Sequence, residues 1–132
     1  MGTFVRKNAY MRMSDNGELR KVFLTKEFLE FYESLSIQIQ HKFDYVVSIV
    51  KTERVISAKF VKHLENTDFY EMRVAVGNNE YRTVLFTMDN RDVMLATRII
   101  LLNAFVKKST KDYRKQIEKA QKILGGLTYD ED

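Results

Sequence analysis

The chain has 132 residues, of which 45% are hydrophobic, and its 22 Lys and Arg against 18 Asp and Glu give a net charge of +4. This length fits one domain with a buried core. The absence of Cys excludes a thiolate nucleophile and a Cys-based zinc site, and gives no support for a disulfide scaffold. With no membrane-spanning apolar run and no secretory signal in residues 1–13, we expect a soluble, cytoplasmic protein.

Residues 1–19 allow two interpretations. The segments FVRKNAYMRM and ELRKVFLT flank Ser-Asp-Asn-Gly, a turn signal, so the chain can begin with a β-hairpin. Alternatively, residues 1 to 19 are an extension that precedes a first strand from Arg20 to Thr25.

Helical periodicity begins after Thr25, a suitable N-cap. Apolar residues recur at helical spacing through KEFLEFYESLS and again from Ile37 to Glu53, with a break near residues 35–37. This pattern predicts a helical hairpin. We expect four of its residues to be buried, namely Phe31, Tyr32, Phe43 and Val47.

The second half predicts strands and a last helix. After a connection over residues 57–68, FYEMRVAVGNNEYRTVLF (69–86) fits two strands around a Gly-Asn-Asn turn. Residues 93–102 fit a buried helix by periodicity, but their β-branched content and the preceding Asp-Asn-Arg-Asp turn favour a strand. A helix over 109–124 is stopped by two glycines, before an acidic tail at 127–132. We therefore expect a single α+β domain with a small antiparallel sheet.

Two arginines stand in the predicted strands. By the period of two, Arg73 shares the less apolar face with Glu71, whereas Arg82 shares the face of Val84 and Phe86. A buried guanidinium needs an anionic partner, so Arg82 forms a structural salt bridge or belongs to an anion-binding site. Further cations concentrate in FVKKSTKDYRKQIEKAQK (105–122) and in AKFVKH (58–63). The two clusters can converge on one surface, whereas Lys119 and Lys122 fit a solvated helix face.

Three segments carry a resemblance to a known family. They are L-x-N-T-D-x-Y-E-x-R-V at 64–74, E-Y-R at 80–82 and L-L-N-x-F-x-K-K-S-T at 101–110. Over residues 20 to 124 the chain resembles the RelE/ParE superfamily of bacterial toxins, in its HigB-like, phage-related branch. The resemblance implies a RelE-like fold, with the helical hairpin packed on the sheet. It also implies a type II toxin, usually a ribosome-dependent mRNA endonuclease (an mRNA interferase), which a helix-turn-helix antitoxin silences, in a homo- or hetero-oligomer.

Metal-independent RNA cleavage uses the RNA 2′-hydroxyl as nucleophile, so the protein supplies a base, an acid and cations for the phosphorane. By resemblance, Arg73 and Arg82 contact the scissile phosphate, and Lys62 or His63 is the base. The remaining candidates bind the RNA backbone or stack on a base, and they are Lys59, Lys107, Lys108, Lys111 and Tyr113. We expect no cofactor and no metal ion, and assign no role to His41.

Three hypotheses remain open. The first is the ribosome-dependent endoribonuclease. The second is a ParE-like inhibitor of DNA gyrase, which needs no phosphate-directed arginine. The third is a non-catalytic basic domain, in which Arg73 and Arg82 merely pair with Glu71, Glu80 or Asp89.

Overall fold

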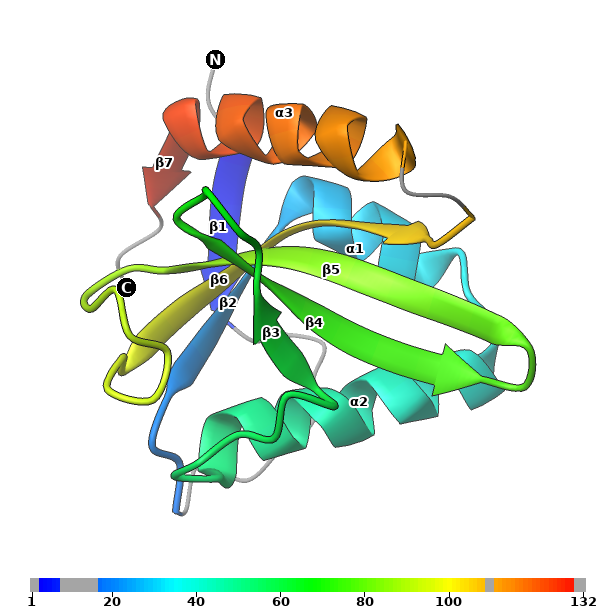
Figure 1. Cartoon of the computed structure of the whole chain (residues 1–132), viewed down its shortest axis with the longest axis horizontal. Coiled ribbons are helices and arrows are strands. Elements are labelled where there is room, and N and C mark those ends of the chain that lie inside the picture. The colour runs from blue at the N-terminus through cyan, green and yellow to red at the C-terminus, as the bar shows by residue number, and fades with distance from the viewer. Residues whose placement is uncertain (1–2, 8–16, 109–110, 130–132) are drawn as a thin grey trace.

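The computed structural model describes residues 3–7, 17–108 and 111–129, which form an α+β fold with a mixed sheet and three helices (Figure 1). The elements are β1 (Thr3–Lys7), β2 (Lys21–Thr25), α1 (Lys26–Glu33), α2 (Ile37–Thr52), β3 (Val61–His63), β4 (Phe69–Val76), β5 (Asn79–Thr87), β6 (Arg98–Val106), α3 (Lys111–Gly125) and β7 (Leu127–Tyr129). The seven strands have the order β3-β4-β5-β6-β2-β1-β7. In the described part of the chain, no helix is both long enough and apolar enough to cross a membrane.

The N-terminal hairpin is confirmed, because β1 pairs antiparallel with β2. Most of its predicted turn lies outside the described residues. The strand that the alternative interpretation placed first, at Arg20 to Thr25, is present as β2, but it is the second strand of the chain. It leads directly into α1. Thr25 accounts for that junction, since its hydroxyl accepts a hydrogen bond from the Phe28 N–H at 3.0 Å, as an N-cap does, and donates to the Leu102 carbonyl of β6.

The predicted helical segment consists of two helices, α1 and α2, which residues 34–36 separate. Ser36 is the N-cap of α2, and the Tyr32 hydroxyl of α1 donates to Asp44 of α2 at 2.6 Å. Of the four residues expected to be buried, Tyr32, Phe43 and Val47 are buried and Phe31 is half-buried. The arrangement of the two helices as a RelE-like hairpin stays a prediction.

The two strands of residues 69–86 are confirmed as β4 and β5. Their turn begins at Gly77, whose φ of 60° lies in the left-handed region that glycine adopts without strain. This turn fixes the register that places Arg73 directly opposite Arg82. A β-bulge at Val84/Leu85 then shifts the pairing of β5 with β6.

Four expectations need correction. The sheet is mixed, not antiparallel, because β2 runs parallel to β6 and β1 runs parallel to β7. The predicted connection contains β3, and the predicted tail contains β7. The strand predicted at 93–102 is β6, at 98–106, because the Asp92 carboxylate binds the Met94 N–H in a turn and Asp89 binds the N–H groups of Thr97 and Arg98.

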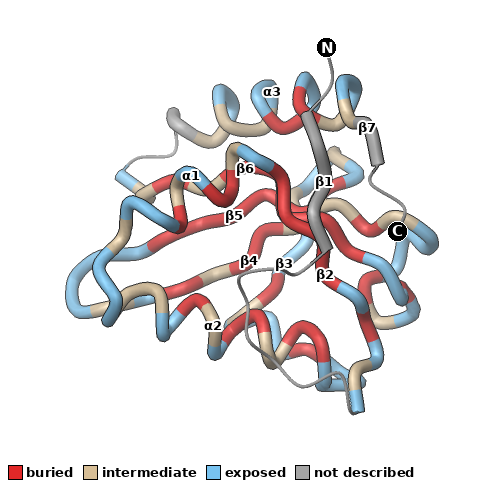
Figure 2. Tube along the Cα trace, turned by 180° about the vertical axis from the view of Figure 1, so that it is seen from behind, coloured by how far each residue is buried: buried red, intermediate tan, exposed pale blue. Residues whose placement is uncertain are grey.

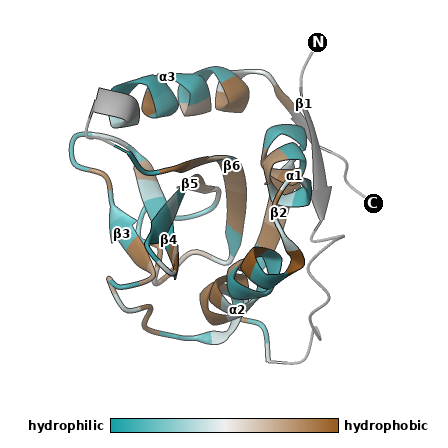
Figure 3. Ribbon diagram, turned by 90° about the vertical axis from the view of Figure 1, so that its right-hand side faces the viewer, coloured by the Kyte–Doolittle hydropathy of each residue, from teal (hydrophilic) through white to brown (hydrophobic). Residues whose placement is uncertain are grey.

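The helices cover the two faces of the sheet and create two apolar cores (Figures 2 and 3). Residues of α1 and α2 pack on one face, around Phe43, Val47 and Leu101. Residues of α3 pack on the opposite face, where Ala120 and Ile123 meet Ile100 and Leu102. Arg82 faces the α3 side, since it lies opposite Phe105, whose ring contacts Tyr113 of α3.

Candidate functional site

The two strand arginines lie side by side. Because Arg73 of β4 and Arg82 of β5 are directly opposite in an antiparallel pair, their side chains leave the same face of the sheet. Arg82 is 3% exposed, whereas the side chain of Arg73 is 29% exposed. The sheet therefore presents one guanidinium held in place and a second that reaches solvent.

Arg82 has the anionic partners that its burial requires. Its Nη2 lies 2.7 Å from Glu80 Oε1, its Nε lies 3.7 Å from Glu71 Oε1, and Nε donates to the Tyr113 hydroxyl at 3.1 Å. Burial alone lowers the pKa of Arg82, but the hydrogen bonds with Glu80 and Tyr113 outweigh it and the pKa is raised. The hydrogen bond from Arg82 lowers the pKa of Glu80. Arg82 is thus a fixed positive charge.

Glu71 connects the two arginines with Tyr113. Its carboxylate is buried and lies 3.1 Å from Arg73 Nε, in addition to its contact with Arg82. Burial raises the pKa of Tyr113, and so does a hydrogen bond with Glu71. The Tyr113 phenol therefore stays protonated at neutral pH, beside the guanidinium of Arg82.

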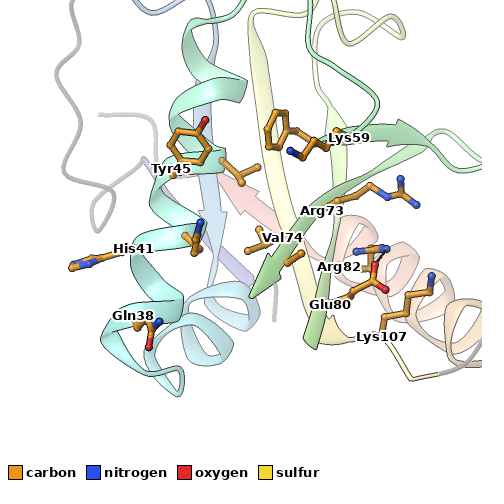
Figure 4. Close-up of a pocket in the computed structure, with 13 residues that line it drawn as sticks. Gln38, His41, Tyr45, Lys59, Arg73, Val74, Glu80, Arg82 and Lys107 are labelled. Atoms are coloured by element: carbon orange, nitrogen blue, oxygen red, sulfur yellow. Dashed lines mark hydrogen bonds and ion pairs between the residues drawn. The ribbon is translucent and has the colours of Figure 1, made fainter. Parts of the chain in front are cut away.

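A groove of about 930 Å³ opens beside this cluster (Figure 4). One wall is α2. The other is the part of β4 beyond its pairing with β3, at Arg73, Val74 and Ala75. The lining residues are Gln38, His41, Lys42, Tyr45, Val46, Lys59, Phe60, Arg73, Val74, Ala75, Glu80, Arg82 and Lys107. Lys59 and Lys107, from the two basic segments of the sequence, thus meet Arg73 and Arg82 at one groove.

The structure separates the two candidate bases. Lys62 of β3 lies opposite Glu71 of β4 in the strand register and is therefore on the same face of the sheet as the two arginines. His63 pairs with Tyr70 and lies on the opposite face, where its ring packs on Tyr70 and its Nε2 is 2.8 Å from the Thr67 carbonyl oxygen. His63 also falls in the predicted connection over residues 57–68, whereas it ends β3.

The other predicted cations have different surroundings. Lys108 is exposed after the end of β6, and Lys119 and Lys122 are exposed on α3 as expected. Lys111 begins α3, and its side chain lies outside the described part of the structure.

Sequence reasoning missed the contribution of α2 to the groove. Tyr45 is 58% exposed and its ring lies 6.3 Å from that of Phe60, edge to face. The sequence pattern did not single it out, because the groove arises from a long-range contact between α2 and β4. His41, which received no role, is at the rim, and its ring points away from the arginines in Figure 4.

A family comparison gives this cluster its context. The model of the family described as phage derived protein Gp49-like matches residues 30–124, which is more than half of the chain. The chain belongs to the Gp49-like family. This is a RelE/ParE-like toxin family, and the match contains β3 to β6, the groove and most of α3. Neither the curated proteins nor the solved structures that were compared contain a significant match.

Proposed function

We propose that this Gp49-like chain is the toxin of a type II toxin–antitoxin system, in the HigB-like branch of the RelE/ParE toxins, and acts as a ribosome-dependent mRNA endonuclease. The observation that carries the proposal is the pair Arg73 and Arg82, directly opposite on neighbouring strands, beside the protonated phenol of Tyr113. RNA cleavage through the 2′-hydroxyl requires cations, an acid and a base, and this face supplies the cations and the acid side by side.

In the proposed reaction the 2′-hydroxyl attacks the adjacent phosphorus, and the bond to the 5′-oxygen breaks. This leaves a 2′,3′-cyclic phosphate and a 5′-hydroxyl end. Arg82 and Arg73 stabilise the negative charge of the phosphorane, and Tyr113 gives its proton to the leaving 5′-oxygen. No side chain forms a covalent bond with the RNA.

Lys62 is the better candidate for the base, because it shares the arginine face whereas His63 lies on the other face. Glu71 is a positioning residue, since its contacts with Arg73, Arg82 and Tyr113 fix the distances between these groups. Lys107, Lys108 and Lys111 would bind the RNA or ribosomal backbone. The antitoxin partner would be a helix-turn-helix protein.

The direct test is induced expression in bacteria, followed by mapping of new RNA 5′ ends. Under the proposal, growth stops and new 5′-hydroxyl ends appear within translated reading frames. Growth arrest without new ends would instead support inhibition of DNA gyrase. The absence of both effects would reject the toxin proposal.

Removing the Tyr113 hydroxyl, which is the proposed proton donor and also accepts a hydrogen bond from Arg82, tests the role of Tyr113. Tyr113→Phe keeps the ring, which packs 5.5 Å from Phe105, and removes the hydroxyl. We expect cleavage of ribosome-bound message to slow by about 10²-fold, the lower end of the usual contribution of acid catalysis. Single-turnover cleavage measures the effect, and unchanged cleavage would remove Tyr113 from the mechanism.

A second candidate function has one observation in its favour, namely that Glu71 and Glu80 already pair with Arg82. In a non-catalytic basic domain these ion pairs would serve stability alone. Because the folded-state pKa of Glu80 is lowered, its contribution to stability is present above its unfolded pKa and is lost as the pH falls through the folded pKa.

Glu80→Gln distinguishes the two candidates. If Arg82 binds phosphate, this variant removes a competing carboxylate, and we expect about threefold tighter binding of a single-stranded oligonucleotide at neutral pH. The affinity of the wild type would approach that of the variant as the pH falls through the folded-state pKa of Glu80. If the pair serves only stability, Glu80→Gln lowers the unfolding midpoint at neutral pH and leaves oligonucleotide affinity unchanged.

A further inference from the structure

The groove extends well beyond Arg73 and Arg82. Strand β3 pairs with β4 only at Tyr70–Met72, so from Val74 onward β4 has no strand neighbour on that side among the described residues. There α2 faces β4 across the groove. In Figure 4 Arg82, Glu80 and Lys107 lie at one end and Tyr45 and Lys59 lie at the other, with Arg73 between Lys59 and Arg82.

The charge of the groove is unbalanced. Its lining contains five Lys and Arg, and Glu80 is the single acidic residue among the lining residues. The five cations are Lys42, Lys59, Arg73, Arg82 and Lys107. They come from α2, from the segment before β3 and from three strands or strand ends, so no single helix face accounts for them. Such a row of positive charge suits a chain of phosphates better than one small anion.

The far end of the groove adds an aromatic surface. Tyr45 is more than half exposed, and its ring stands edge to face with Phe60. The Lys59 ammonium lies 5.5 Å from the centre of the Phe60 ring. Proteins that bind single-stranded nucleic acids use this arrangement, in which a base stacks on the exposed aromatic ring and a lysine neutralises a neighbouring phosphate.

We propose that this groove binds a single-stranded stretch of RNA, with one unstacked base on Tyr45 and neighbouring phosphates on Lys42 and Lys59, and guides it to Arg82. The proposal rests on the proposed endonuclease function for the identity of the bound strand. A base inside a duplex has no free face for Tyr45, so the occupant is single-stranded. The groove thereby holds the message on one side of the cleaved bond.

The test measures binding separately from cleavage. The probe is a labelled 12-nucleotide DNA of mixed sequence, which lacks the 2′-hydroxyl and therefore cannot be cut, and the protein is the full chain. We expect Tyr45→Ala and Lys59→Glu each to weaken binding about tenfold in fluorescence anisotropy. Tyr45→Phe keeps the stacking ring and should restore binding to within about twofold of the wild type.

Val55→Ala is the matched control, since Val55 is 75% exposed and does not line the groove. It should bind as the wild type does. If Tyr45→Ala and Lys59→Glu also bind as the wild type does, the groove proposal is overturned. If they weaken only the binding of poly-glutamate, the groove accepts an acidic segment of a partner protein, and the proposal is again overturned.

The endonuclease proposal is judged independently. A wild-type protein that cuts message through Arg82, while the groove variants bind normally, would reject the groove and keep the endonuclease. A wild-type protein that cuts nothing, but whose oligonucleotide binding requires Tyr45, would keep the groove as a binding site and reject the endonuclease.

Discussion

Arg82→Ala is expected to slow RNA cleavage by about 10²–10³-fold and to abolish growth arrest. The guanidinium is fixed by Glu80, Glu71 and Tyr113 before any substrate binds, so it stabilises the phosphorane without reorganising. Losing one such preorganised contact typically costs about 3 kcal/mol of transition-state stabilisation. Growth curves and single-turnover cleavage of ribosome-bound message measure the loss.

The variant should still fold, because the buried Glu71 carboxylate keeps Arg73 at 3.1 Å and retains its hydrogen bond with Tyr113. Circular dichroism checks this point. Arg91→Ala is the control for the loss of a positive charge, since Arg91 is exposed in the loop before β6. If Arg82→Ala remains folded and fully toxic, Arg82 does not contact the phosphate, and its role is the ion pairs alone.

Local signals explain which elements were predictable. The period of α1 and α2, the cap at Thr25 and the glycine turn at Gly77 act over a few residues, so the sequence displays them. The start of β6 was misplaced because Val93 and its neighbours are as apolar as a strand, while the carboxylates of Asp89 and Asp92 bind the backbone there. Strands β1 and β7 pair although they lie near opposite ends of the sequence, and no local sequence pattern predicts such a pairing.

The candidate site was predictable only where alternate residues of a predicted strand could be assigned to opposite faces of the sheet. Parity placed Arg73 with Glu71, and their contact follows from that placement. His63 could not be assigned to a face in this way, because β3 was not expected. In a strand, neighbouring residues such as Lys62 and His63 point to opposite faces, so a shift of one position changes the assignment. Tyr45 joined the groove through the packing of α2 beside β4, which depends on the whole fold.

The most important structural residue that sequence reasoning missed is Arg20. It stands just before β2, where an arginine suggests a solvated strand end, yet it is 1% exposed. Its guanidinium donates to five backbone carbonyls, those of Val50 (3.0 Å), Glu53 (2.6 Å), Arg54 (3.0 Å), Val93 (2.9 Å) and Met94 (3.1 Å). One side chain therefore joins the C-terminal end of α2 to the loop that precedes β6.

Arg20→Leu is expected to lower the free energy of unfolding by about 3–5 kcal/mol, because it leaves several buried carbonyl oxygens without donors. Domains of this size are stable by only about 5–15 kcal/mol, so the variant is expected to be partly unfolded at growth temperature. Urea unfolding measures the loss. Arg20→Lys, with one ammonium in place of the guanidinium, reaches fewer carbonyls and should fall between Leu and the wild type.

Arg54→Ala is the control, because Arg54 is exposed and the substitution keeps the backbone carbonyl that accepts from Arg20. It removes only the repulsion between the two positive charges. Equal urea midpoints for Arg20→Leu and Arg54→Ala would show that the carbonyl contacts contribute no net stability. A large loss for Arg20→Leu alone would show that these contacts stabilise the fold on which the site depends. Arg20 binds carbonyls at the C-terminal end of α2, and α2 is one wall of the groove.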